Sequence, residues 1–353
     1  MYKYYLLFAI AFLFMSCNQT DPKTGFWSIS RSKELPEAVT NQAVSEGIVG
    51  GVRYIYSFGG IDSTKLYTGI HRRSYRMNTE TEIWERIPDL PDTLGKIASA
   101  ATRIDNIIYI IGGYHVFKDG SERSSNKVHR FDIEKNRFLE DGASIPVPID
   151  DQVQVLWKNR FIYLITGWSD RTNVPAVQIY DSKNNHWLKG SSVPDDNYYK
   201  SFGASGAIIG DTIYYLGGAS MHEHYKIQSV LRKGIINPYN PIEINWSHQI
   251  LDSVYSGYRM ASFTRKNRIY WIGGSDATYN YNGIAYDGGK GVIPNRRILS
   301  YNSYEFSVDF NKNIPMDLRG IANIDDSTKY LLGGIDKNQK VSRQVLHLEW
   351  STK

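Results

Sequence analysis

The sequence predicts an all-β fold built from six copies of one structural unit. Its 353 residues include 26 Tyr, 8 Trp and 30 Gly, and such a content of aromatic residues and glycines favours short strands joined by tight turns. A strand that ends in a glycine pair recurs along the chain, as in Ile108-Tyr-Ile-Ile-Gly112-Gly113. Each end of the chain also carries only part of the repeated unit. These three observations together predict a closed ring of repeats.

The glycine-pair strand appears five times, and a sixth, degenerate copy lies between the second and third. The copies end at Gly59-Gly60, Gly112-Gly113, Thr166-Gly167, Gly217-Gly218, Gly273-Gly274 and Gly333-Gly334. Their intervals of roughly 50 to 60 residues match a propeller blade of four strands. The apolar residues before each pair suit an inner strand that is buried on both faces, and the glycines permit a tight exit from it.

A second pattern follows each glycine pair: another strand, a polar turn and then an aromatic residue. It is clearest in Tyr180-Asp181 followed by Trp187, and variants run from Tyr75 to Trp84, from Phe131 to Phe138 and from Tyr301 to Phe306. We expect these last aromatics to pack between neighbouring blades. Together with the glycine pairs, these residues resemble the kelch repeat family over nearly all of residues 26–353. The resemblance implies a six-bladed kelch β-propeller.

The two ends of the chain predict how the ring closes. The last repeat has a third strand around residues 344–350, followed only by Ser-Thr-Lys, so it lacks a fourth strand. Phe26-Trp27-Ser-Ile-Ser precedes the first repeat and is typical of a fourth strand without its blade. We therefore expect the N-terminal strand to complete the last blade, which would leave few exposed sheet edges.

The N-terminal segment is typical of an export signal. Lys3 is followed by an apolar run over residues 4–15 and then by Ser16-Cys17, a run too short to span a membrane comfortably. The segment resembles a bacterial lipobox, which implies a signal peptide of residues 1–16, lipidation of Cys17 and a tether of residues 17–25. The expected location is the cell envelope, at the outer membrane on its periplasmic or surface side. A plain secretory signal is the alternative.

Charge and cysteine content exclude several functions. The formal net charge is +5, with 41 basic and 36 acidic residues interspersed, so no basic stripe for nucleic acid is expected. Cys17 is the single cysteine, which rules out an intramolecular disulfide framework and a cysteine-based zinc site.

Candidate ligand-binding residues should converge on one face of the propeller. The segments before each innermost strand and the loops after each glycine pair open on the same side of the central channel. Counting back from the glycine pairs places a ring of residues there, near Asn41, Lys96, Asp151, Lys200, Arg259 and Arg319. Cations at a channel mouth would suit a carboxylate or another anion. Structural pairing of the arginines with neighbouring loops is an equally weighted alternative.

The loops after the glycine pairs add aromatic candidates. The longest, residues 275–297, carries Tyr279, Tyr281 and Tyr286, whose flat rings and polar tips suit a sugar. Trp168 follows the degenerate repeat, and Glu122 lies in the loop of residues 114–126. A solvated insertion is the alternative interpretation of the longest loop.

One cluster, His222-Glu223-His224, resembles a metal site or an acid/base pair. A firm metal site needs a third or fourth ligand, and the spacing identifies none. A polar loop is the favoured interpretation, so no metal and no cofactor are expected.

These observations favour an exported, lipid-anchored propeller that binds a glycan or an envelope protein on its loop-rich channel face. The alternative is an enzyme, and the sequence leaves this open. An exported six-bladed kelch propeller resembles the N-acetylneuraminate epimerase (sialic acid mutarotase) family. That resemblance implies a general acid/base, for which His222, Glu223 and His224 are weak candidates, and an arginine for the substrate carboxylate, either Arg259 or Arg319. A galactose-oxidase-like copper radical enzyme is set aside, because its cofactor requires a tyrosine crosslinked to a cysteine.

Overall fold

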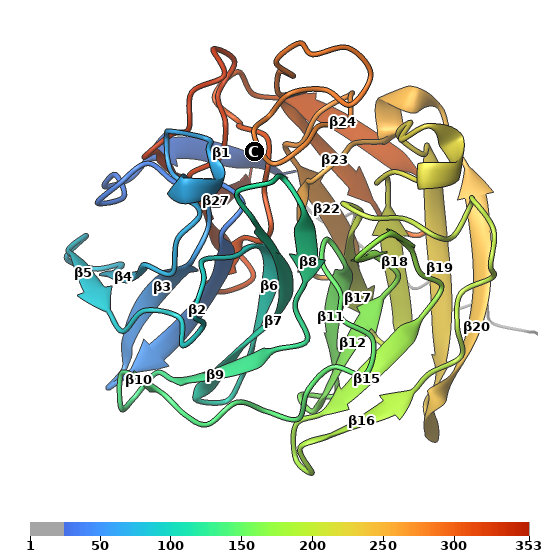
Figure 1. The fold of residues 1–353 in the computed structure, drawn as a ribbon, viewed down its shortest axis with the longest axis horizontal. Coiled ribbons are helices and arrows are strands. Elements are labelled where there is room, and N and C mark those ends of the chain that lie inside the picture. The colour runs from blue at the N-terminus through green and yellow to red at the C-terminus, as the bar shows by residue number, and fades with distance from the viewer. Residues whose placement is uncertain (1–24, 353) are drawn as a thin grey trace, which may run out of the picture.

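The computed structural model describes residues 25–352 and confirms the all-β, six-bladed propeller (Figure 1). Six antiparallel sheets follow one another around a central channel, each with four main strands, here called a to d from the axis outward. In Figure 1 the outer strands β5, β10, β16 and β20 lie at the rim, while β6, β11 and β17 lie nearer the centre.

The first three blades share the same strand order from the centre outward. Blade 1 is β2 (Ala43–Val49), β3 (Val52–Phe58), β4 (Ser74–Asn78) and β5 (Trp84–Ile87). Blade 2 is β6 (Ile97–Ile104), β7 (Ile107–Val116), β9 (Val128–Asp132) and β10 (Arg137–Phe138), with β8 (Glu122–Ser124) paired to the end of β7. Blade 3 is β11 (Val153–Trp157), β12 (Phe161–Ile165), β15 (Val177–Asp181) and β16 (His186–Lys189).

The remaining blades repeat this order, and the last one includes the N-terminal strand. Blade 4 is β17 (Ser205–Ile209), β18 (Thr212–Leu216), β19 (Val230–Asn237) and β20 (Asn240–Ile250). Blade 5 is β21 (Ala261–Arg265), β22 (Arg268–Ile272), β23 (Arg297–Tyr301) and β24 (Phe306–Phe310). Blade 6 is β25 (Ala322–Asn323), β26 (Thr328–Leu332), β27 (Val345–Thr352) and β1 (Gly25–Arg31). Short elements in the loops are the hairpin β13 (Trp168–Ser169) and β14 (Thr172–Asn173), and the 3-10 turns η1 (Tyr67–Gly69), η2 (Met221–Glu223) and η3 (Ser253–Tyr255).

The predicted ring closure is confirmed. β1 pairs with β27 along its whole length, from Gly25 opposite Thr352 to Arg31 opposite Leu346, and Figure 1 shows the two strands side by side. Trp27 packs edge-on against Trp350 in its own blade at a centroid distance of 5.3 Å. It also packs against Phe263 of blade 5 at 5.2 Å, so the closing strand is held by a neighbouring blade as well.

The apolar core is divided into six wedges, one between each pair of adjacent blades. The wedge between blades 2 and 3, for example, contains Ile111, Val128, Leu164 and Tyr180. The fourth-strand aromatic Trp187 packs there as predicted, and its indole N–H donates to the Ala143 carbonyl at 2.7 Å. Each blade is therefore stabilised mainly by the two blades beside it.

The glycine pairs join adjacent blades. All of these glycines have positive φ, and the degenerate Thr166 adopts the same backbone with φ of 46°. In four blades the second glycine donates its N–H to a carbonyl of the next blade, as from Gly218 to Gly257 at 2.9 Å. A Cβ on Gly217 would collide with that same carbonyl oxygen, which explains the requirement for glycine. The face that carries these joints, the segments before each a strand and the b–c loops is called the loop face below.

Cys17 and the predicted signal and tether lie outside the described residues, apart from Gly25 in β1. Within residues 25–352, no helix has the length and apolar character needed to cross a bilayer.

Candidate functional site

A ring of six backbone positions surrounds the channel on the loop face. The ring contains one residue from each blade, near the start of its a strand, and every member has a left-handed backbone: Asn41, Ala98, Asp151, Gly203, Arg259 and Asp317, with φ from 48° to 65°. Backbone N–H groups run from one blade to the previous one, for example from Gly203 to the Asp151 carbonyl at 2.9 Å and from Arg259 to the Gly203 carbonyl at 2.8 Å. These backbone hydrogen bonds fix the positions of the six Cα atoms around the channel.

This ring matches the sequence-based one at Asn41, Asp151 and Arg259 and differs from it in the other three blades. There Ala98, Gly203 and Asp317 take the positions expected for Lys96, Lys200 and Arg319. The sequence-based ring was placed by counting residues back from each glycine pair. This count differs between blades, because the hairpins that join the a and b strands differ in length. The ring consequently contains one basic side chain and two acidic ones.

Arg259 closes the centre of the channel. Its Nε and Nη2 donate to the two carboxylate oxygens of Asp151 at 3.1 and 2.6 Å, and its Nη1 donates to Asp317 at 3.1 Å. The guanidinium also lies over the rings of Tyr258 and Tyr279, 5.2 and 5.5 Å from their centroids. Arg259 is 1% exposed, so its donors are already committed to partners within the protein.

We call Arg259 with its partners Asp151 and Asp317 the plug, and Arg319 lies on its inner side. Its Nη1 is 3.4 Å from Asp151 and its Nη2 donates to the Gln152 carbonyl at 3.0 Å. It lines a narrow inner cavity of about 130 Å³ formed by the a strands. Arg259 and Arg319 together balance the charges of Asp151 and Asp317.

Outside the plug, the loop face opens into a cavity of about 300 Å³, which we call the channel mouth. It is lined by carboxyl groups, aromatic rings, one amide, one guanidinium group and one glycine, contributed mainly by blades 2 to 5: Tyr114, Gly120, Glu122, Asp150, Asp151, Trp168, Asp170, Phe202, Tyr225, Arg259, Asn280 and Tyr286. Of the predicted ligand-binding residues, it brings together Asp151, Trp168, Arg259 and Tyr286. A cavity of this size and mixed lining is typical of a small-ligand site.

The carboxyl groups outnumber the cations in the channel mouth. Glu122, Asp150 and Asp170 have no basic side chain within ion-pair distance in the described part of the chain. Burial, followed by the nearby charge of Asp151, raises the pKa of Asp150 well above its usual range, although the Ser124 hydroxyl donates to it at 2.6 Å. Glu122 is exposed at the rim of the cavity, but partial desolvation of its carboxyl group by the surrounding loops raises its pKa to about 7, with Arg259 opposing the shift. Glu122 can therefore carry a proton near neutral pH.

Aromatic rings form one wall of the channel mouth. Tyr225 and Tyr286 stack with their centroids 4.8 Å apart, and Trp168 packs edge-on against Phe202 at 5.3 Å. Tyr279, by contrast, is buried beneath Arg259, with its ring 5.1 Å from that of Tyr258. Tyr281 is partly buried on the apolar cluster around Ile61 and Tyr114. Only Tyr286 of the three predicted tyrosines lines the cavity.

Lys96 and Lys200 lie away from the channel mouth. Lys96 is buried between blades 1 and 2, where its Nζ is 3.0 Å from Asp92, and His129 bridges the same Asp92 to Asp141 at 2.8 and 2.7 Å. Burial lowers the pKa of Lys96, and Asp92 opposes this shift. Lys200 forms an ion pair with Asp195 at 2.5 Å.

The cluster His222, Glu223 and His224 lies on and just after η2, in the b–c loop of blade 4. The Glu223 carboxylate accepts a hydrogen bond from Asn197 at 2.8 Å, and none of the three residues lines the channel mouth. Residues 25–352 contain no group of three or more His, Cys, Asp or Glu side chains placed to hold a metal ion.

Sequence reasoning did not select Asp150, Tyr114, Phe202 or Asn280 for the site. Asp150 and Phe202 each come directly before a ring residue, and both form bridges to the residue after the glycine pair of their own blade. If the ring positions had been known, the residue before each of them could have been predicted to lie beside the residue that follows the glycine pair, and both residues would have been identified.

These features define the class of the protein: a six-bladed β-propeller that carries the kelch motif. The family model for the kelch motif matches residues 98–139, which is nearly the whole of blade 2. A solved structure titled "Structure of YjhT" superimposes with a TM-score of 0.71 at 13% identity, over 90% of this chain and 96% of that one, and this likeness concerns the fold.

Curated relatives are matched over part of their length. They include Kelch-like protein 26 of Danio rerio, 26% identical over 66% of this chain and 36% of the relative, and Kelch-like protein 15 of Homo sapiens, 27% identical over 38% of this chain and 21% of the relative. Spermatocyte protein spe-26 of Caenorhabditis elegans is 25% identical over 49% of this chain and 29% of its own. The matches thus span about a fifth to a third of the relatives' length.

Proposed function

We propose that the protein is an exported, lipid-anchored binding propeller that holds an uncharged or positively charged sugar residue of a glycan in its channel mouth. The observation that carries this proposal is the composition of one cavity: unpaired carboxyl groups beside aromatic rings, with Arg259 already bound by two carboxylates. Carboxyl and amide groups accept hydrogen bonds from sugar hydroxyls, and aromatic faces pack against the apolar side of a sugar ring.

The same cavity disfavours an acidic sugar. A substrate carboxylate would have to displace Asp151 or Asp317 from Arg259, leaving a buried carboxylate without its partner, at a cost of about 3–5 kcal/mol. It would also meet the charge of Asp170 and, at higher pH, that of Glu122.

One observation favours a second candidate, a mutarotase or epimerase acting on a neutral or amino sugar. Opening and closing a sugar ring requires a group that donates a proton and one that accepts it, with pKa values near the working pH. Glu122, with its pKa raised to about 7, and Asp150, with its pKa raised well above its usual range, lie in the same cavity. They are better placed for this role than His222, Glu223 and His224, which lie outside the cavity.

The test is NMR of the purified protein with a neutral hexose, a hexosamine and N-acetylneuraminate. We expect saturation transfer from the protein to the neutral or amino sugar, and Tyr286→Ala should weaken binding about tenfold, equivalent to 1.4 kcal/mol. Tyr304→Ala is the matched control, because Tyr304 is 93% exposed on blade 5 and remote from the cavity.

The outcomes separate the candidates. Faster exchange between α and β anomers that is lost in Glu122→Gln would establish the enzyme and overturn the binding-only function. Transfer restricted to N-acetylneuraminate, or equal binding by Tyr286→Ala and the parent, would contradict the proposed site.

A further inference from the structure

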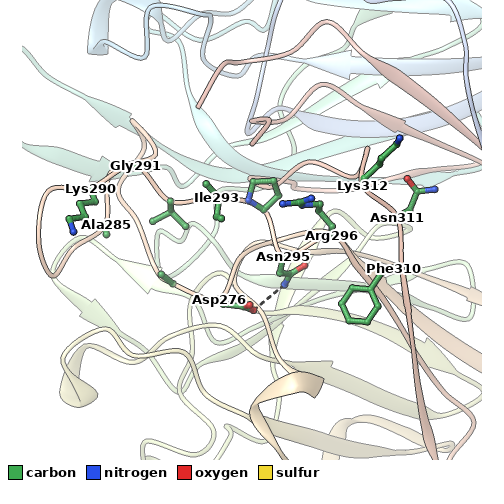
Figure 2. Close-up of a pocket in the computed structure, with 13 residues that line it drawn as sticks. Asp276, Ala285, Lys290, Gly291, Ile293, Asn295, Arg296, Phe310, Asn311 and Lys312 are labelled. Atoms are coloured by element: carbon green, nitrogen blue, oxygen red, sulfur yellow. Dashed lines mark hydrogen bonds between the residues drawn. The ribbon is translucent and has the colours of Figure 1, made fainter. Parts of the chain in front are cut away.

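A second hollow on the loop face lies on the outer side of the long b–c loop of blade 5. It measures about 670 Å³ and is lined by this loop and by the end of β24. We call it the basic groove; its lining includes Asp276, Lys290, Ile293, Arg296, Phe310 and Lys312. Figure 2 shows these side chains around the groove, with Lys290 on the loop and Phe310, Asn311 and Lys312 beyond Arg296. It shares no lining residue with the channel mouth.

The groove carries three cations without partners. Within residues 25–352, Lys290, Arg296 and Lys312 make no ion pair, and their side-chain nitrogens donate no hydrogen bond to another side chain or to the backbone. The acidic residue of the lining, Asp276, is already bound by Arg297 at 2.6 Å. The groove therefore offers an uncompensated positive charge that would attract a negatively charged ligand.

A backbone hydrogen bond holds Arg296 close to the segment that carries Lys312. Arg296 has φ of 60°, a conformation that costs a non-glycine residue roughly 1–2 kcal/mol. Its carbonyl accepts the N–H of Asn311 at 3.0 Å, which ties the end of the loop to the segment that carries Lys312. Strain of this kind persists where the surroundings fix it and is frequent at binding sites.

Apolar side chains accompany the cations. Ile293 is 55% exposed and Phe310 is 68% exposed, and both line the groove. Phosphate or a simple polyanion would satisfy the cations but leave these side chains in water. Arginine and aromatic residues together are typical of protein interfaces, and a peptide that combines carboxylates with an apolar side chain would satisfy both parts of the groove.

We propose that the basic groove docks an acidic peptide segment of a protein partner, with an apolar side chain of that segment seated against Ile293 and Phe310. This inference is independent of the sugar site. It rests on the charge complementarity between three unpaired cations and carboxylates, and on the exposed apolar pair beside them.

The experiment selects from a phage-displayed library of random peptides on the immobilised full-length protein. We expect enriched peptides that contain Asp or Glu near a large apolar residue. Fluorescence anisotropy with one enriched peptide should show a loss of at least about tenfold in affinity for the double variant Arg296→Gln, Lys312→Gln. The matched control is Lys183→Gln with Lys189→Gln, which makes the same charge change at two exposed positions of blade 3, away from the groove, and should bind normally.

Two further measurements make the proposal falsifiable. Phe310→Ser should weaken the peptide while sugar binding at the channel mouth stays unchanged. If enriched peptides lack acidic residues, bind the double variant and the control equally, or bind equally well when their apolar residue is replaced by Ser, the proposal is overturned. Failure to enrich any peptide that distinguishes the double variant from the control also overturns it.

Discussion

Replacing Arg259 by Met is the most informative single change in this molecule. The substitution keeps an unbranched side chain in the channel but removes the charge that neutralises Asp151 and Asp317, which are 2% and 1% exposed. Removing one partner of a buried ion pair costs about 3–5 kcal/mol, because the remaining charge stays buried. Asp151 keeps Arg319 at 3.4 Å, and Asp317 keeps the Thr40 hydroxyl at 2.9 Å, so we expect the lower part of this range.

The assay is thermal and urea unfolding of Arg259→Met beside the parent. A loss of 3 kcal/mol corresponds to a fall in Tm of roughly 4 °C for a chain of this size. The deficit should depend on pH. Burial already raises the pKa of Asp317 and Arg259 opposes that shift, so removing Arg259 raises the folded-state pKa further. A raised folded pKa costs stability as pH rises through it, and the deficit should be larger near about pH 8 than near about pH 5.

A triple variant provides the control. Adding Asp151→Asn and Asp317→Asn to Arg259→Met removes the stranded charges and should recover most of the lost stability. If Arg259→Met unfolds within about 1 kcal/mol of the parent and yet loses all sugar binding, Arg259 is a ligand-binding residue and the structural interpretation of the plug is refuted.

Two more predictions concern the channel mouth and the ring closure. Since the pKa of Glu122 is raised to about 7, affinity for a neutral sugar should increase as pH rises through this value, because a carboxylate accepts stronger hydrogen bonds than a carboxylic acid. Isothermal titration calorimetry should give a flat profile of affinity against pH for Glu122→Gln and an unchanged profile for the control Glu80→Gln, which does not line the cavity. Trp27→Ala removes the edge-on contacts with Phe263 and Trp350 and should cost about 3–5 kcal/mol in urea unfolding, and a loss below 1 kcal/mol would contradict the stabilising role of the closing strand.

The fold could be predicted because its main signals are local. The glycine pairs mark positions where the backbone needs positive φ and the next blade approaches closely, as at Gly217 beside Gly257. A requirement of this kind is visible in the sequence wherever it recurs. The closing strand could also be predicted, since the last blade visibly lacked a d strand and Trp27 stood alone before the first.

The site could be predicted only in part, because it depends on contacts between distant blades. Arg259 and Asp151 are 108 residues apart, and no spacing in the sequence reveals that they form an ion pair. Ala98 and Asp317 hold ring positions with left-handed backbone but carry no glycine that would have marked them. The sequence therefore predicted a cationic channel mouth, whereas pairing of the arginines leaves the unpaired carboxyl groups to set its charge.

The direction of β1 determines on which side of the propeller the preceding chain is attached. As the d strand of blade 6, β1 begins at Gly25 opposite Thr352, the end of β27 farthest from the b–c loop. The chain that precedes Gly25 thus joins the propeller on the side opposite the loop face. If Cys17 carries a lipid, the eight residues from Asn18 to Gly25 span at most about 28 Å when extended. The propeller would then stand close to its bilayer, attached on the side opposite the channel mouth and the basic groove.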